Sequence, residues 1–415
     1  MWLGAFLFLR NFVKISNMSF IPKIEKITMD ATIVHFFLLF GYKTFSLYFP
    51  LFLVARGLSL PEVGYSFLLI YLPISLFAPI AGFLNHKINP ALLSAVGVFG
   101  YALYALGMIL VQNQALFYFW QVLLGISAAL FFVSIRSILM GFPLENADRS
   151  FGWFYSAPFY ADALAPAVGA FFVWRFDFIG VFILSLVLHL FTALFCFLKL
   201  RKPAKTLTDA GFGVGDSQDN YQKIFQLLKQ KKIFPFISIS FAVLLLGGFY
   251  HAFFVLFLKD QLAWSQNLIL IFVSVFSALF LPLSFFLIKY LEKNDSRKSI
   301  FKGGMIAGLI SIVFGAAAGF LNFFSVLLIN LLRSAGALIC NSSRSGLVSR
   351  SFKTEPEEAS AIDTIFAPLG VALGALISGL LIGFFGYESL FILGGIFVAA
   401  TVLLFGIFVK RQELR

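Results

Sequence analysis

The chain has 415 residues, of which 60% are hydrophobic and only 12% are charged, whereas roughly 25% charged residues are typical of a soluble domain. This composition excludes a soluble globular protein and indicates an integral membrane protein. The net charge of +12 does not indicate nucleic-acid binding, because the charges are confined to short segments between apolar runs. Cys196 and Cys340 both lie inside apolar runs, so neither a disulfide framework nor a CxxC metal site is predicted.

Residues 1–29 are predicted to form a cytoplasmic N-terminal segment. The apolar stretch from Trp2 to Leu9 is far shorter than the ~20 residues that a membrane span needs, and no basic region precedes it, which argues against a signal peptide. Two interpretations remain open. The stretch is an interfacial segment, or translation starts at Met18 or Met29.

Twelve apolar runs are long enough to cross a membrane, and they form two sets of six. The runs are 31–55, 62–84, 91–111, 115–141, 151–174 and 177–199, then 234–258, 267–290, 300–320, 323–348, 360–385 and 388–409. We therefore predict an all-α membrane protein with twelve transmembrane helices in two pseudo-symmetric six-helix bundles. The halves are residues 30–199 and 234–409, followed by a short cytoplasmic tail, 410–415.

The segment 200–233 is the only long polar stretch and is predicted to be a cytoplasmic linker. Within it Tyr221, Ile224, Phe225 and Leu228 share one helical face among several lysines, which predicts an amphipathic helix on the inner leaflet. The predicted inner segments hold 24 lysines and arginines and the outer loops only three. This bias predicts that both termini are cytoplasmic.

Two patterns recur between the halves. Val133-Ser134-Ile135-Arg136-Ser137-Ile138-Leu139 returns 208 positions later as Asn341-Ser342-Ser343-Arg344-Ser345-Gly346-Leu347, and Ala157-Pro158 returns 210 positions later as Ala367-Pro368. Small residues follow each Ala-Pro pair and indicate close helix packing. Duplicated hydrophobic halves are typical of secondary transporters. Chance similarity between apolar segments is the alternative.

Three shorter motifs carry a resemblance to a known family. They are Gly82-Phe83-Leu84-Asn85-His86-Lys87 after the second predicted span, Gln121-Val122-Leu123-Leu124-Gly125 in the fourth, and Ala161-x-x-x-Ala165-Pro166-x-x-Gly169-Ala170 in the fifth. With the six plus six spans and the basic central segment, the chain resembles the major facilitator superfamily of secondary transporters over residues 30–412. His86 and Gln121 stand where that family has an acidic residue and an arginine. The third motif resembles one associated with exporters.

The resemblance implies a transporter that works by alternating access, its two halves rocking about a site near the membrane midplane. We predict a monomeric secondary active transporter of a small organic solute in the plasma membrane. Efflux of drug-like amphipathic compounds is an alternative, and a lipid flippase is another. No enzyme or nucleotide-binding motif is present, and no cofactor is predicted.

Ionisable residues inside predicted spans are candidates for function, because each costs roughly 2.5–3.5 kcal/mol on insertion scales. Lys43, Asp162 and Arg333 all lie near the predicted midplane, and their surplus positive charge would suit an anionic or zwitterionic substrate. The alternative is a structural ion pair with a snorkelling lysine. Tyr42 and Tyr250 are candidates for the walls of the same site.

Proton coupling needs a group that titrates as the cavity opens and closes. Asp162 is the first candidate, and His251 in the seventh predicted span is the second. His189 lies in the sixth span, outside the expected cavity lining, and is predicted to be structural.

Arg136 and Arg344 lie nearer the cytoplasmic ends of their spans, with Asp363 among the acidic residues nearby. An inner gate of ion pairs is one interpretation of their symmetry. Simple anchoring of both arginines at the membrane interface is the other.

Overall fold

The computed structural model describes residues 22–46, 49–55, 57–111, 113–208, 233–352 and 356–413, and these ranges are almost wholly α-helical without a β-strand. The predicted amphipathic helix around Tyr221 and the apolar stretch from Trp2 to Leu9 lie outside them. The first half contains α2 (Lys26–Ser46), α3 (Phe49–Ala55), α4 (Leu60–Lys87), α5 (Pro90–Leu110), α6 (Gln114–Gly141) and α7 (Ala147–Thr208). The second contains α9 (Phe234–Asp260), α10 (Gln266–Lys293), α11 (Ser296–Ala316), the 3-10 turn η2 (Ala318–Phe320), α12 (Phe323–Ser351) and α13 (Pro356–Glu413).

Two of these helices each contain two predicted spans. α7 breaks at Asp177, where φ is 55°, and α13 breaks at Gly386, where φ is 73°, a left-handed value that glycine adopts without strain. With α2 and α3 forming the first crossing, the described helices give two successive sets of six crossings. The predicted all-α membrane architecture is confirmed, although α7 continues to Thr208, into the segment assigned to the linker.

By length and composition alone, nine helices of the described ranges qualify as membrane spans, and Ala359–Val409 includes both parts of α13. The crossings outside this set are α2 with α3 and the first part of α7. They carry Lys43 and Asp162.

Polar residues at the helix ends account for several boundaries. The side chains of Asn113, Ser265 and Asp295 each accept a hydrogen bond from a backbone N–H in the first turn of α6, α10 and α11, respectively. Asn322 and Ser325 form a reciprocal pair at the start of α12. Such caps satisfy N–H groups that have no partner inside the helix.

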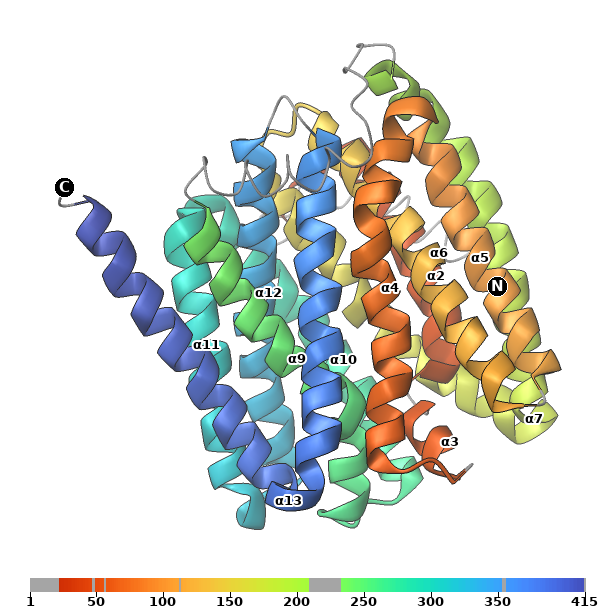
Figure 1. Ribbon diagram of the computed structural model, residues 1–415, viewed down its shortest axis with the longest axis vertical. Coiled ribbons are helices and arrows are strands. Elements are labelled where there is room, and N and C mark those ends of the chain that lie inside the picture. Colours follow the sequence, from red (N-terminus) through yellow and green to blue (C-terminus); the bar gives the residue numbers. More distant parts are fainter. Residues whose placement is uncertain are drawn as a thin grey trace.

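The two halves meet mainly along two pairs of helices, α4 with α13 and α7 with α10, and also where α7 contacts α12 and α6 contacts α13. Figure 1 shows α4 beside the blue α13 near the centre of the molecule. Contact is close, since a Cβ on Gly64 would lie 2.9 Å from the backbone oxygen of Ala375. The loops 88–89, 142–146 and 294–295 lie at one end of the bundle, which we call the basic end and which is uppermost in Figure 1.

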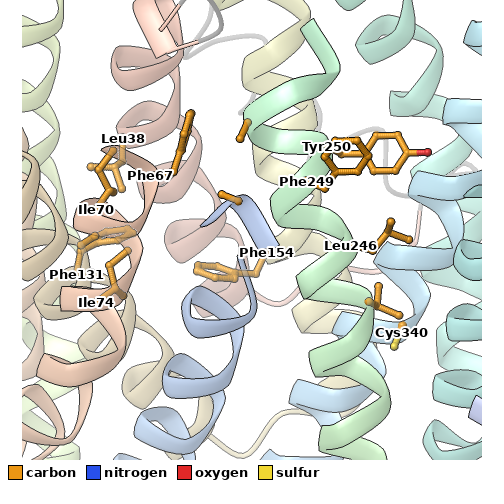
Figure 2. Close-up of a cluster of buried hydrophobic side chains, with 14 of the residues drawn as sticks. Leu38, Phe67, Ile70, Ile74, Phe131, Phe154, Leu246, Phe249, Tyr250 and Cys340 are labelled. Carbon is orange, nitrogen blue, oxygen red and sulfur yellow. The ribbon is translucent and has the colours of Figure 1, made fainter. Parts of the chain in front are cut away.

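Buried apolar side chains from both halves form the core. Figure 2 shows Leu38, Phe67, Ile70, Ile74 and Phe131 from the first half and Leu246, Phe249, Tyr250 and Cys340 from the second. Large apolar side chains also cover the outer surface, including Leu198, Phe324 and Phe384, which are 65%, 78% and 84% exposed. An apolar outer surface of this kind suits a lipid environment.

Candidate functional site

A cavity of about 360 Å³ lies between the halves. It is lined by α2, α4 and α7 from the first half and by α9, α10, α12 and α13 from the second. Its lining residues are Lys43, Ser46, Tyr71, Phe159, Asp162, Gly247, Tyr250, His251, Phe254, Val255, Phe272, Val273, Phe276, Asn330, Arg333, Ser334 and Val371. The predicted group Lys43, Asp162 and Arg333 therefore shares one cavity, and we call these three residues the cavity cluster.

Lys43 and Asp162 form an ion pair on the first-half wall of the cavity. The Lys43 ammonium donates to a carboxylate oxygen of Asp162 and also to the backbone oxygen of Pro158, at 3.2 Å. Pro158 has no N–H, which leaves the carbonyl of Phe154 free within α7. The imidazole of His35 bonds that carbonyl at 2.9 Å. The proline thus tethers α7 to α2 beside the ion pair.

Arg333 lies on the second-half wall without a carboxylate partner among the described residues. Its guanidinium sits 3.8 Å from the ring centroid of Tyr250, a cation–π contact, and one of its terminal nitrogens donates to Ser334 at 3.3 Å. Its Nε is buried without a hydrogen-bond partner. Tyr250 is held in turn by Ser311, whose hydroxyl is 3.3 Å from the tyrosine oxygen.

His251 and Tyr42, two further candidates, lie in different surroundings. His251 is exposed to the cavity, and its ring contacts Phe67 and Tyr71 of α4 across the two halves, with centroids 5.4 and 5.7 Å apart. Tyr42 packs instead against Tyr101 at 5.8 Å and is not among the cavity-lining residues. The duplication relates Tyr42 to Tyr250 and Lys43 to His251 by the same offset of 208 positions.

His189 lies buried within the first half, away from the cavity. Its Nε2 is 3.0 Å from the backbone oxygen of Leu38, and its Nδ1 is 3.2 Å from the hydroxyl of Ser185. Both ring nitrogens therefore have polar partners inside the bundle, an arrangement that suits a structural residue.

The three residues predicted as a gate also come together, nearer the basic end. Asp363 of α13 lies 2.8 Å from Nε of Arg344 and 3.5 Å from a terminal nitrogen of Arg136. All three side chains are buried, with exposed fractions of 0%, 2% and 7% for Asp363, Arg344 and Arg136. We call them the gate cluster. Arg136 belongs to the first half, so this carboxylate joins the halves.

Sequence reasoning missed the polar groups that complete the gate cluster. Tyr155 of α7 donates to Asp363 at 2.8 Å, and Ser345 donates to the same carboxylate at 2.7 Å. Tyr155 and Asp363 are 208 positions apart, the same offset that relates Arg136 to Arg344. Extending the duplication register beyond the repeated motif would have found this tyrosine.

A second ionic network joins the halves at the basic end. Arg149 lies 2.7 Å from Glu292, 3.1 Å from Glu145 and 3.3 Å from Glu25. Hydrogen bonds from Lys23 and Arg149 lower the pKa of the exposed Glu145 carboxyl. The first-half loop has His86 where the resemblance predicts an acid. In this network the second half supplies Glu292, which lies near the end of α10.

A third contact at this end involves Asp148. Its carboxylate lies 2.9 Å from a terminal nitrogen of Arg350 in α12 and accepts a hydrogen bond from Ser296 in α11. It adds one more ionic link between the first half and the second.

Comparisons with known proteins agree with this architecture. The family model of the Major Facilitator Superfamily matches residues 31–355 and 237–414. The fold is similar to a crystal structure of the human organic anion transporter MFSD10 (TETRAN), with a TM-score of 0.72 and 14% identity, covering 92% of this chain and 100% of that one. It is also similar to a bacterial homologue of the iron transporter ferroportin in its outward-facing state, with a TM-score of 0.67 and 14% identity, covering 94% and 100%. No curated protein sequence matches. The resemblance inferred from the sequence is confirmed: the chain belongs to the Major Facilitator Superfamily.

Proposed function

We propose that the protein is a secondary transporter that moves a small organic anion across the membrane by alternating access. Arg333 is the observation that carries this proposal. A cation facing a cavity at membrane depth is costly, and among the described residues no carboxylate compensates it. An anionic substrate would supply the missing charge. The fold similarity to an organic anion transporter supports the same substrate class.

Ion pairs between the halves near the basic end support a rocking motion. Asp363 with Arg136, Arg149 with Glu292, and Asp148 with Arg350 all link the first half to the second near the basic end. In our proposal residues 30–199 and 234–409 move as two bodies joined by the linker 200–233. These bonds form an inner gate that breaks when the cavity opens inward.

The orientation and setting are part of the proposal. The predicted inner segments hold 24 lysines and arginines and the outer loops only three, and this bias supports a cytoplasmic position for the basic end and for both termini. We propose that the cavity is then reached from the opposite, outer side. We propose a monomer in the plasma membrane.

Asp162 and Lys43 provide a route to proton coupling. Protonation of Asp162 would remove the carboxylate that holds Lys43 and release the ammonium toward the cavity. His251 is the second proton-binding candidate, because its ring is exposed to the same cavity. Replacing Asp162 with Asn should flatten the pH dependence of transport, and an unchanged profile would reject this role for Asp162.

The proposed function is tested by ligand-dependent thermal stability of the purified protein, because a ligand stabilises the state that it binds. The panel holds organic anions, amino acids, sugars and lipophilic cations, applied to the wild type and to Arg333→Ala. Arg175→Ala is the matched control, since Arg175 also lies over an aromatic ring but outside the cavity lining.

We expect an organic anion to raise the melting temperature of the wild type and of Arg175→Ala but not of Arg333→Ala. Stabilisation by lipophilic cations that survives in Arg333→Ala would overturn the proposal. That result would favour the efflux alternative, which the aromatic cavity walls also suit.

A further inference from the structure

We propose that the substrate is an aromatic monocarboxylate, and that the Lys43–Asp162 pair selects against dicarboxylates. This inference rests on the proposed function, because it specifies the anion that the cavity binds. Three features carry it: the charge of the cavity, the contacts of Arg333 and the aromatic walls.

The net charge of the cavity lining favours a substrate with a single negative charge. Its charged lining residues are Lys43, Asp162 and Arg333, and the first two pair with each other. With a neutral imidazole at His251, one positive charge remains, at Arg333. A monoanion neutralises it, whereas a dianion leaves one charge unpaired where desolvation is costly.

The contacts of Arg333 favour a carboxylate. One face of its guanidinium is occupied by the ring of Tyr250, and the nearby Ser334 accepts from one terminal nitrogen. Its Nε has no hydrogen-bond partner although it is buried. Two neighbouring N–H groups on one guanidinium edge match the two oxygens of a carboxylate. Ring stacking holds that edge in a fixed plane.

The walls favour a flat aromatic body. Phe159, Phe254, Phe272 and Phe276 line the cavity together with Tyr250. Phe272 stacks on Phe276 with centroids 6.2 Å apart, and Phe159 of the opposite half lies 6.3 Å from Phe276. Aromatic rings gain from offset or edge contacts with such walls. The volume of about 360 Å³ is near the lower limit of drug-sized pockets, roughly 300–1,000 Å³, and suits a one-ring acid.

The test measures dissociation constants by titration calorimetry on the purified full chain. The four probes are 3-phenylpropionate, phenylsuccinate, hexanoate and 3-phenylpropionamide, which vary the charge and the ring separately. We expect 3-phenylpropionate to bind about tenfold more tightly than phenylsuccinate, and the uncharged amide to show no binding. Loss of the ring in hexanoate should weaken binding about two- to tenfold, the value of an aromatic contact.

Variants of the Lys43–Asp162 ion pair test whether the charge of the cavity sets the preference for a monoanion. Asp162→Asn releases Lys43, so phenylsuccinate should gain about tenfold in affinity relative to 3-phenylpropionate. Lys43→Met combined with Asp162→Asn removes both charges and should restore the preference for the monoanion. Phe276→Leu should remove the ring preference, whereas Phe285→Leu, outside the cavity lining, should keep it.

The two proposals fail in different ways. If anions bind through Arg333 but phenylsuccinate or hexanoate binds as tightly as 3-phenylpropionate to the wild type, only the inference on substrate class is overturned. If no anion in the thermal-stability panel binds, the proposed function itself fails. The wild-type measurements decide these outcomes even where a variant does not fold.

Discussion

The cavity cluster and the gate cluster have the same composition, two basic residues and one aspartate, but their contacts differ. In the gate cluster one carboxylate contacts both arginines and is completely buried. In the cavity cluster Lys43 is the cation that the carboxylate contacts among the described residues, and the side chains of Lys43 and Asp162 are 18% and 22% exposed. Arg333 stands apart on the other wall. Equal charge counts therefore give one group whose charges are paired within it and one that leaves Arg333 open to a ligand.

This difference predicts that the gate cluster contributes mainly to stability, whereas Arg333 of the cavity cluster contributes mainly to ligand binding. Buried charges persist only where partners and hydrogen bonds compensate their loss of water, and the gate cluster has both. Removing a member of it should destabilise the protein. Removing Arg333 should cost little stability, because its compensation is proposed to come from the substrate. The following changes are ordered by the size of the expected effect.

Asp363→Ala should have the largest effect on stability. It leaves Arg136 and Arg344 buried beside each other without a carboxylate, and breaking a buried pair costs about 3–5 kcal/mol. The free energy of unfolding in detergent measures the loss. Asp162→Ala, in the partly exposed cavity cluster, should lose less. Equal losses would show that the two clusters do not differ in this way.

Arg344→Ala and Arg333→Ala compare arginines on the same helix, α12. Arg344 bonds Asp363 and also donates to Ser240 at 3.0 Å, so its loss should destabilise the protein by about 3 kcal/mol. Arg333→Ala removes a cation–π contact worth roughly 0.5–2 kcal/mol. This loss is offset because the variant no longer buries a charged guanidinium. Thermal unfolding of both variants measures the two losses of stability. A larger loss for Arg333→Ala than for Arg344→Ala would contradict the comparison.

Tyr155→Phe tests the hydrogen bond that the gate cluster receives from the first half. A hydrogen bond to a charged group contributes about 1.5–3 kcal/mol, so stability should fall by that amount. Tyr160→Phe is the matched control on α7, because Tyr160 bonds a neutral partner, Ser284, at 2.9 Å. Its loss should be about 0.5–1.5 kcal/mol. A larger loss for Tyr160→Phe than for Tyr155→Phe would show that the Tyr155 hydrogen bond does not stabilise the gate cluster.

A double-mutant cycle measures the coupling within the cavity cluster. Lys43→Met, Asp162→Asn and the double variant should give a coupling energy of about 1 kcal/mol, because exposure to the cavity screens this pair. The same cycle for Arg344 and Asp363 should give a larger value. If the cavity pair couples more strongly, it is a structural ion pair and not a releasable one.

Glu145 should give the smallest effect, since it is exposed. Its folded pKa is lowered by Lys23 and Arg149, so the folded protein binds fewer protons than the unfolded chain. The resulting stability is present above the ordinary glutamate pKa and is lost as the pH falls through the lowered value. Glu145→Gln should therefore reduce the decline of melting temperature in acid. An unchanged decline would show that Glu145 is not linked to folding.

The sequence was sufficient to predict the fold class, because each membrane helix corresponds to a long apolar run. Each run must satisfy its backbone hydrogen bonds internally, so length and hydropathy alone predicted helices at these positions. One boundary differed, because α7 continues to Thr208, past the end of the apolar run at residue 199. The observed break at Asp177 lies one residue after the gap between the runs 151–174 and 177–199, and the break at Gly386 lies inside the gap between 360–385 and 388–409.

Only part of the candidate site could be predicted from the sequence. The cost of charges within a span singled out Lys43, Asp162 and Arg333, and the repeated motif singled out Arg136 and Arg344. Hydrophobic patterning carries no information about partners across the bundle. It therefore gave no indication that Tyr155 bonds Asp363, or that Tyr42 packs away from the cavity.

The amino-acid sequence by itself determined the helical membrane architecture, its duplication and the identity of the charged interior residues, because these follow from local hydropathy and repeated spacing. Tertiary packing alone decided which charges pair. Helices distant along the chain bring Asp363 against both arginines of the gate cluster but leave Arg333 facing the cavity on the ring of Tyr250. The physical reason is that pairing depends on distances of a few ångströms between helices, which no periodicity along one chain encodes.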